Sequence, residues 1–98
     1  MRDMSTDKKR EEAKRKQELQ ALQEKADWDW LLADERGRRI LYRTLGFCGI
    51  HRSVFEPNAM KLSFLEGQRN VGLYLWDKVA RYVPNRVAQM IEMRDSDA

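Results

Sequence analysis

The chain has 98 residues, of which 36 % are charged and 42 % apolar, and its formal net charge is +3. An average globular chain is only about 25 % charged, and this length suffices for one small domain. No apolar run is long enough to span a membrane, and the N-terminus lacks the apolar stretch of a signal peptide. One cysteine and one histidine are too few for a disulfide or a closed zinc site.

Residues 1–26 form a charged segment with little hydrophobic content. They hold eight Lys or Arg and six Asp or Glu, whereas all nine aromatic residues follow them. Pairs such as Glu11 and Arg15 lie four residues apart, a spacing that supports a helix. The apolar stripe is too narrow for a coiled coil. We therefore expect an arm over 1–26, helical on a partner or else mobile, in front of a small domain over 27–94.

Start and stop residues divide the next part of the chain into two helical elements. Asp27 or Asp29 is suited to cap a short turn that holds two tryptophans and two leucines. Asp34 is the predicted N-cap of a second helix over about 35–46. Gly46 is suited to the left-handed position that follows a helix C-terminus.

A loop and a long helix follow. Residues 47–58 lack periodicity and contain a glycine and a proline, which predicts an ordered loop. Its apolar residues need burial and are Phe47, Ile50, Val54 and Phe55. Asn58 is the predicted cap of a helix over about 59–83. Apolar residues cover more than half of its circumference, which predicts a central helix surrounded by other elements.

Pro84 ends the long helix, because its ring disfavours helical geometry at the preceding residue. A short last helix over about 85–94 follows, and we expect residues 95–98 to be a disordered tail. No strand-like alternation occurs anywhere. The predicted fold class is therefore all-α, with a long central helix preceded by a charged helical arm.

The sequence offers little for catalysis. Cys48 and His51 are three residues apart, and a Cys–His pair can in principle activate the thiol. No third orienting group accompanies them, so a small buried thiol and a surface imidazole are the favoured interpretation. We expect no enzyme activity, no cofactor and no metal.

An arginine stripe is one candidate partner-binding surface. Arg36, Arg39 and Arg43 share one side of the predicted second helix, opposite its apolar side. Such a stripe can contact phosphates, but several acidic residues crowd the same end. Three interpretations of this stripe therefore remain open: a solvated or ion-paired face, a protein-binding surface, or a nucleic-acid contact.

Two tryptophans are further candidates. Trp28 and Trp30 are two residues apart, so they point to different sides of a helical turn. One can serve the core. The other remains available to a partner, since tryptophan is enriched at the energetic centres of interfaces.

The segment from Glu66 to Gly72 is the most unusual in the chain. Arg69 lies on the apolar face of the long helix, where a charge needs a partner. Glycines inside a helix cost about 1 kcal/mol each relative to alanine, so Gly67 and Gly72 suggest close approach of another backbone. We expect a structural network of Glu66, Gly67, Arg69 and Gly72, in which Arg69 pairs with Glu66 or with a carboxylate of another segment. The alternative is that Arg69 binds an acidic partner.

Four segments together carry a family resemblance over roughly residues 27–83. They are Asp34-Glu35-Arg36-Gly37-Arg38-Arg39-Ile40-Leu41, then Leu45-Gly46-Phe47-Cys48-Gly49-Ile50, a Phe55 near a Pro/Asn turn, and Glu66-Gly67-Gln68-Arg69-Asn70-Val71-Gly72-Leu73. The sequence resembles a small domain family of tailed phages and prophages that is named after a protein of a Bordetella short-tailed phage. The arm and the last helix lie outside this resemblance.

The resemblance implies a phage gene of the morphogenesis region, close to portal and capsid genes. It implies no enzyme and supplies no catalytic residue. We expect a virion or assembly protein that docks on the portal or head–tail vertex, found in the virion and, during assembly, in the cytoplasm of the infected bacterium. Expected partners are phage structural proteins and further copies of the chain, with no membrane. The alternative is a nucleic-acid-handling factor in genome packaging or ejection, which would contact DNA.

Overall fold

A computed structural model describes residues 4–52 and 55–97. Its elements, in chain order, are α1 (Met4–Ala33), α2 (Glu35–Cys48), α3 (Ala59–Tyr82), the short 3-10 helix η1 (Pro84–Arg86) and α4 (Val87–Asp97). Within these ranges the chain contains no strand. The all-α prediction is confirmed.

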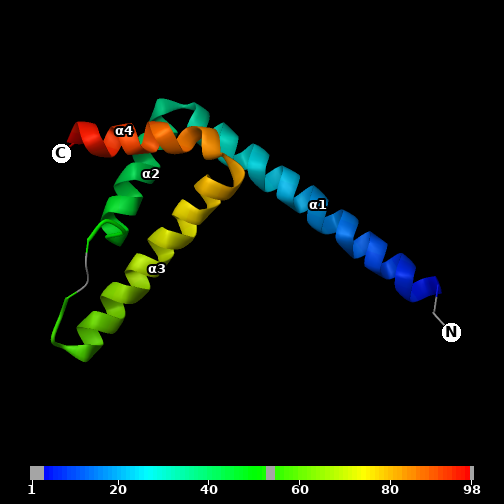
Figure 1. Cartoon of the computed structure of the whole chain (residues 1–98), viewed down its shortest axis with the longest axis horizontal. Coiled ribbons are helices and arrows are strands. Elements are labelled where there is room, and N and C mark those ends of the chain that lie inside the picture. Colours follow the sequence, from blue (N-terminus) through cyan, green and yellow to red (C-terminus); the bar gives the residue numbers. More distant parts are fainter. Residues whose placement is uncertain (1–3, 53–54, 98) are drawn as a thin grey trace.

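The first helix is longer than predicted. The charged arm and the tryptophan segment form one continuous α1, which projects from the rest of the molecule (Figure 1). Asp27 and Asp29 lie inside this helix and cap nothing, so the predicted short turn is wrong. No glycine or proline occurs between Met4 and Ala33, and nothing in this stretch therefore interrupts the helix.

Asp34 separates α1 from α2 and acts as the N-cap of α2, as predicted. Its side-chain oxygen accepts a hydrogen bond from the backbone N–H of Arg36 at 2.8 Å. Arg38 reaches back across the junction and donates to the carbonyl oxygen of Leu32 at 2.7 Å. That carbonyl lies in the last turn of α1, where helix carbonyls lack partners within their own helix. Side chains at the junction thus cap both the C-terminal end of α1 and the N-terminal end of α2.

The predicted end of α2 needs a correction. Gly46 lies within α2, and Gly49, at φ 72°, is the left-handed residue that follows it. The N–H of Gly49 donates to the carbonyls of Leu45 and Gly46, both at 3.1 Å. Both glycines suit a left-handed position, but only Gly49 follows the last buried turn, which ends at Cys48.

The later helix boundaries agree more closely with the sequence. The Asn58 side chain caps α3 by accepting from the N–H of Lys61 at 3.0 Å, and the helix stops before Pro84. The last helix, α4, runs to Asp97, so the tail predicted to be disordered is helical over its described part. No glycine or proline follows Pro84 to end this helix earlier.

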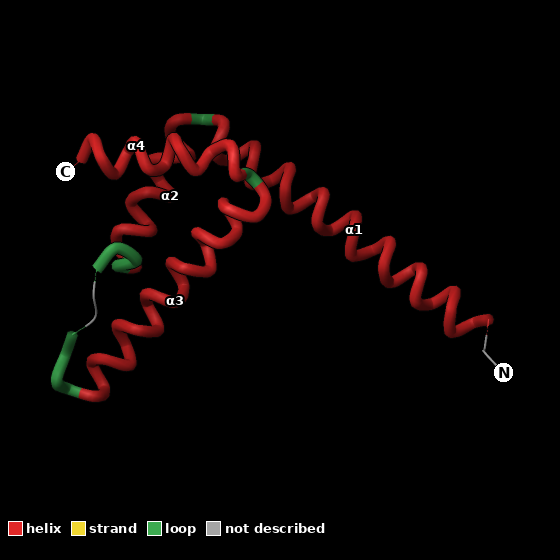
Figure 2. The backbone as a smooth tube through the Cα atoms, viewed as in Figure 1, coloured by secondary structure: helices red, strands yellow, loops and turns green. Residues whose placement is uncertain are grey.

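The core lies where the end of α1, all of α2, the second half of α3 and α4 meet (Figure 2). Its buried members are Leu32, Leu41, Leu45, Cys48, Ile50, Val79, Val83 and Met90. Trp28, Trp76 and five other half-buried residues pack against this cluster. The helices α1, α3 and α4 contribute to the core over only part of their length.

The prediction that α3 is surrounded is wrong. Met60 is 85 % exposed and Phe64 is 70 % exposed, and only Gly72 and Val79 of the whole helix are buried. The reason lies in α1, which leaves the molecule and does not cover the N-terminal half of α3 (Figure 1). Of the loop residues expected to be buried, Ile50 is buried, Phe47 and Phe55 are exposed, and Val54 lies outside the described residues.

Two ion pairs hold α1 on the rest of the molecule. Lys78 of α3 lies 2.9 Å from Glu24 of α1, and Arg86 of η1 lies 3.7 Å from Asp29. The part of α1 that precedes Glu24 projects from the rest of the molecule. This projection gives the molecule a radius of gyration of 18.7 Å. A compact chain of this length would have roughly 13 Å. No helix among the described residues is long and apolar enough to cross a membrane.

Candidate functional site

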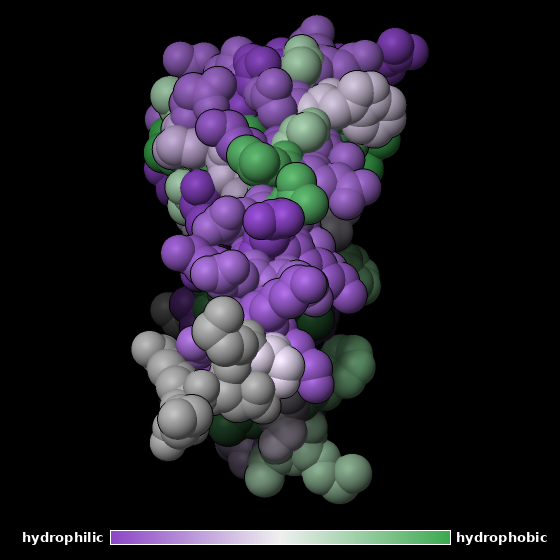
Figure 3. All heavy atoms as spheres, turned by 90° about the vertical axis from the view of Figure 1, so that its right-hand side faces the viewer, coloured by the Kyte–Doolittle hydropathy of each residue, from purple (hydrophilic) through white to green (hydrophobic). Residues whose placement is uncertain are grey.

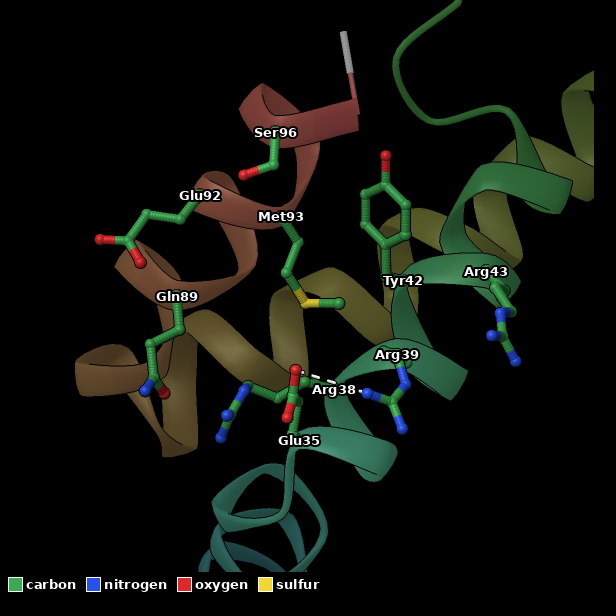
Figure 4. A pocket seen from close by; sticks show the side chains of 9 residues that line it. All are labelled: Glu35, Arg38, Arg39, Tyr42, Arg43, Gln89, Glu92, Met93 and Ser96. Carbon is green, nitrogen blue, oxygen red and sulfur yellow. Dashed lines mark ion pairs between the residues drawn. The ribbon is translucent and has the colours of Figure 1, made fainter.

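A groove between α2 and α4 has a volume of about 580 Å³ (Figure 4). One wall comes from α2 and the other from α4. Its lining residues are Glu35, Arg38, Arg39, Tyr42, Arg43, Gln89, Glu92, Met93 and Ser96. The Met93 side chain extends from α4 toward α2, so the floor is apolar while the rims are charged.

The charges of this α2–α4 groove are largely balanced. Arg39 pairs with Glu35 at 3.4 Å, and Arg38 is held by the carbonyls at the end of α1. Arg43 stands at the edge of the groove, turned away from α4, and it forms no ion pair with a described residue. The groove therefore presents one unpaired guanidinium, which is too little for a dedicated phosphate site.

A second cavity, of about 300 Å³, continues from this groove. Its apolar lining comes from Leu45, Trp76, Met90 and Ile91, and its rim carries Arg43, His51 and Arg94. Tyr42 and Arg43 border both cavities. An apolar floor under cationic side chains suits an apolar side chain of a protein partner that has an acidic neighbour.

The predicted arginine stripe does not act as a unit. Arg36 is engaged by Asp34 at 3.2 Å, and the same residue accepts from the Arg36 backbone. Arg39 is engaged by Glu35, and only Arg43 is left for a partner. Among the alternatives left open by the sequence, the ion-paired face fits Arg36 and Arg39.

The two tryptophans differ in surroundings. Trp28 is half-buried against the core, whereas Trp30 is 78 % exposed. Their spacing predicts such a division. Trp30 stays a candidate for partner binding, and Trp28 has a structural role.

The Glu66–Gly72 segment forms only part of the expected network. Glu66 is exposed and pairs with no described residue, and the Nε atom of Arg69 is buried without a hydrogen-bond partner. The predicted Arg69–Glu66 contact is therefore absent from the described part of the chain. Residues three apart on a helix can miss each other when the longer side chain turns inward, and Arg69 lines a small cavity beside Cys48.

The two glycines of that segment have different roles. A Cβ atom on Gly72 would lie 2.6 Å from the Cβ of Cys48 and closer still to Ile50, so Gly72 permits the tight α2–α3 contact that the sequence suggests. A Cβ atom on Gly67 would meet nothing within 4 Å. No contact within the described chain explains why Gly67 is a glycine.

Two structural residues were missed by the sequence reasoning. Gly37 lies so close to Leu31 that a Cβ atom would overlap the Leu31 carbonyl oxygen. Arg38 supplies the cap of α1 described above. A glycine in the first turn of a predicted helix was the available signal, since it costs stability unless another backbone lies against it.

The Cys48–His51 pair is divided between two environments. Cys48 is buried against Gly72, and His51 is exposed at the rim of the second cavity. Among the described residues, no group of three or more metal-ligating side chains comes together.

The ion pairs at the helix contacts lower the pKa values of two carboxyl groups, those of Glu24 and Asp34. A hydrogen bond from Lys78 lowers the pKa of Glu24 below its ordinary 4.5, and the same contact raises the pKa of Lys78 above 10.5. The rings of Tyr74 and Tyr82 flank the ammonium group at 5.0 and 5.6 Å. Hydrogen bonds from the Arg36 side chain and backbone lower the pKa of Asp34 below 3.8. Both carboxylates hold α1 in place, one on α3 and one at the junction with α2.

Comparison with known protein families decides the identity at the level of the family. The model of the Bbp19-like phage protein family matches residues 28–92. The chain belongs to this family. The match includes most of α4, so the expected boundary near residue 83 was too short, and it excludes the free part of α1. The chain matches no curated protein and no solved structure.

Residues in the segments that carry the family resemblance now have physical roles. Asp34, Gly37 and Arg38 build the α1–α2 junction, and Gly72 closes the α2–α3 contact. The segments that carry the family resemblance thus hold helices together. Surfaces open to partners lie on the arm, on Trp30 and around the α2–α4 groove, which residues of the first of these segments help to line.

Proposed function

We propose that this phage protein is a non-enzymatic virion or assembly protein that docks at the portal or head–tail vertex. It acts there as an internal or ejected component, after assembly in the cytoplasm of the infected bacterium. Phage structural proteins, the portal or its neighbouring subunits, are the proposed partners. The family membership supplies the phage context, and the shape of the molecule supplies the argument for docking.

The free arm is the observation that carries this proposal. From Lys8 to Gln23 every side chain of α1 is exposed, and hydrophilic side chains cover most of the face seen from this end of the molecule (Figure 3). In proteins most helical stability comes from the packing of an amphipathic face on other elements, and this stretch has no such buried face. A long charged helix with exposed side chains is therefore best explained by a neighbour in an assembly that it lies along.

Contacts for such a neighbour are available at the base of the arm and in the second cavity, between α2, α3 and α4. Trp30 is exposed close to the point where α1 joins the body, and the second cavity offers an apolar floor with a cationic rim. Exposed tryptophan and arginine are the residue types that most often dominate binding energy at interfaces. An acidic surface with apolar side chains on the partner would complement them.

Quantitative mass spectrometry of purified, nuclease-treated virions tests the proposal. We expect a copy number comparable to that of the portal protein. Hundreds of copies would instead place the chain on the capsid shell, and absence from virions would contradict a virion component.

Arm deletion tests the docking step. We expect a variant lacking residues 1–21 to fold, because Glu24 and its partner Lys78 are retained, but to be lost from particles. The matched control is the full-length double variant Leu19→Ala and Leu22→Ala, which keeps the charge and the helix. Incorporation of the deletion variant at the normal level would contradict docking through the arm.

A nucleic-acid-handling factor in packaging or ejection is the second candidate, favoured by the exposed lysines and arginines of the arm. It predicts DNA binding that weakens steeply with salt and that depends on Arg43 and the arm. The engagement of Arg36 and Arg39 by their acidic neighbours weighs against it. DNA affinity that does not change between low and physiological salt would eliminate this candidate.

A further inference from the structure

We propose that the exposed face of α3 binds a second copy of the chain, with the two α3 helices antiparallel and crossing at Gly67. The face consists of Met60, Phe64, Gly67, Val71 and Tyr74 and is called the α3 seam below. This inference stands on the structure of the domain alone. It does not rest on the proposed role in the virion.

The spacing of the α3 seam is that of a helix-pairing surface. Its members follow each other at intervals of four, three, four and three residues, the pattern by which one helix packs along another. Met60 and Phe64 are mostly exposed, and Val71 and Tyr74 are exposed by 55 % and 60 %. Scattered apolar residues on a surface are ordinary, whereas a continuous stripe over four turns of one helix indicates an interaction site.

Gly67 identifies the crossing point. It lies in the middle of the α3 seam and inside α3, where a glycine weakens the helix. Its open surroundings within the described chain contrast with those of Gly72, which is in tight contact. A second helix that crosses at Gly67 supplies the missing reason, because the absence of a side chain lets two backbones approach closely.

The side chains beside the α3 seam favour a second copy over an unrelated partner. A two-fold contact brings each surface against itself, so a charge near the axis would face its own copy. The positions that border the central turns of the α3 seam are Ser63, Gln68 and Asn70, all uncharged, in a chain that is 36 % charged. The exposed Glu66 lies further round the helix from the seam. Arm and groove, by contrast, carry dense charge. A neutral strip at the centre of this seam suits self-association.

The antiparallel orientation follows from the position of α1. Glu24 binds Lys78 just beyond the C-terminal end of the α3 seam, so α1 leaves the molecule at that end. A parallel pair would bring both α1 helices to one end of the interface, whereas an antiparallel pair separates them. It places Met60 of one copy near Tyr74 of the other and leaves room beside Gly67 for the Phe64 rings.

Light scattering on the full-length chain during size-exclusion chromatography tests the proposal. We expect a dimer that dissociates on dilution, and we expect Phe64→Glu to raise the dissociation constant by about 30-fold or more, the effect of losing a central interface anchor. The matched control is Ile40→Glu on α2, a residue that is 59 % exposed and outside the α3 seam. Circular dichroism spectra and melting curves verify that both variants fold.

A second variant separates a specific contact from general stickiness. Gly67→Leu adds apolar surface and meets no obstacle within the described chain. A sticky face would dimerise more strongly with the added leucine, whereas a contact that needs close backbone approach dimerises at least tenfold more weakly. A chain that is monomeric at high micromolar concentration, a dimer unaffected by Phe64→Glu, or stronger dimerisation of Gly67→Leu would each overturn the proposal.

Discussion

Both halves of α3 carry apolar residues at helical spacing, but their surroundings differ. In the C-terminal half, Val79 is fully buried, and Lys78 pairs with α1. In the N-terminal half, Met60 and Phe64 face outward, although they are at least as apolar. The difference shows that apolar periodicity defines a surface that needs covering, but not which chain covers it. In the C-terminal half Gly72 and Val79 are buried by the chain's own helices, whereas Met60 and Phe64 of the N-terminal half are left uncovered.

The substitution with the largest expected effect on the packed part of the molecule is Gly37→Ala at the α1–α2 junction. The added methyl group would overlap the carbonyl oxygen of Leu31, which is backbone and cannot move without shifting α1. We expect a loss of about 3 kcal/mol in the free energy of unfolding, at the upper end for overpacking. Urea denaturation followed by circular dichroism measures it.

Gly46→Ala is the matched control within the same helix, because its Cβ atom would meet nothing within 4 Å. It should stabilise the protein by up to about 1 kcal/mol through helix propensity. Equal effects of the two substitutions would contradict the close contact at Gly37.

A second pair compares the two halves of α3 directly. Gly72→Ala should cost about 2 kcal/mol, since the methyl group must displace Ile50 and Cys48 from the core. Gly67→Ala, at concentrations where the protein is monomeric, should instead stabilise it by up to about 1 kcal/mol. The two variants should therefore change the free energy of unfolding in opposite directions, which urea denaturation measures. A loss of stability in both variants would mean that α3 is in tight contact along its entire length.

The arm gives a smaller effect. Because the side chains from Lys8 to Gln23 are exposed, deleting residues 1–21 should change the free energy of unfolding by less than about 1 kcal/mol, the range for surface changes. Thermal melting of the truncated and full-length proteins measures the difference. A large loss would show that the arm folds back on the body in solution.

Local signals predicted much of the fold. Asp34, Asn58 and Pro84 mark helix boundaries through interactions with their immediate neighbours, and such contacts can be inferred from sequence alone. Gly72 was identified correctly because a mid-helix glycine costs stability. These inferences depend on residues within a few positions of each other.

Features that depend on distant segments were not predictable in the same way. Because α1 projects away, it does not cover the outer face of the first half of α3. The periodicity of α3 contains no information about the position of α1. Arg69 was expected to meet Glu66, but its orientation depends on packing beside Cys48, more than twenty residues earlier. The arginine stripe was located correctly on α2. The ion pairs of Arg36 and Arg39, however, depend on the side-chain conformations of Asp34 and Glu35.

The smallest expected effect is a dependence of stability on acidic pH. Glu24 and Asp34 both have pKa values that are lower in the folded protein than their ordinary values of 4.5 and 3.8. The unfolded chain therefore binds protons first, and the stabilisation is complete above about pH 4.5 and decreases as the pH falls through the folded-state pKa values. Melting temperatures should be flat from pH 7 to pH 5 with respect to these groups and should fall below that.

Two substitutions assign this dependence to its sources. Glu24→Gln removes the charge that holds α1 on Lys78, and Asp34→Asn removes a charge but retains a side chain that caps helices about equally well. We expect Asp34→Asn to reduce the acid sensitivity while keeping α2 intact, and Glu24→Gln to reduce it while also loosening α1. Because the Lys78 pair is partly exposed, salt should diminish the Glu24 contribution. If both variants kept the full acid sensitivity of the parent protein, carboxylates elsewhere would be responsible, and these two would not fix α1 in its position.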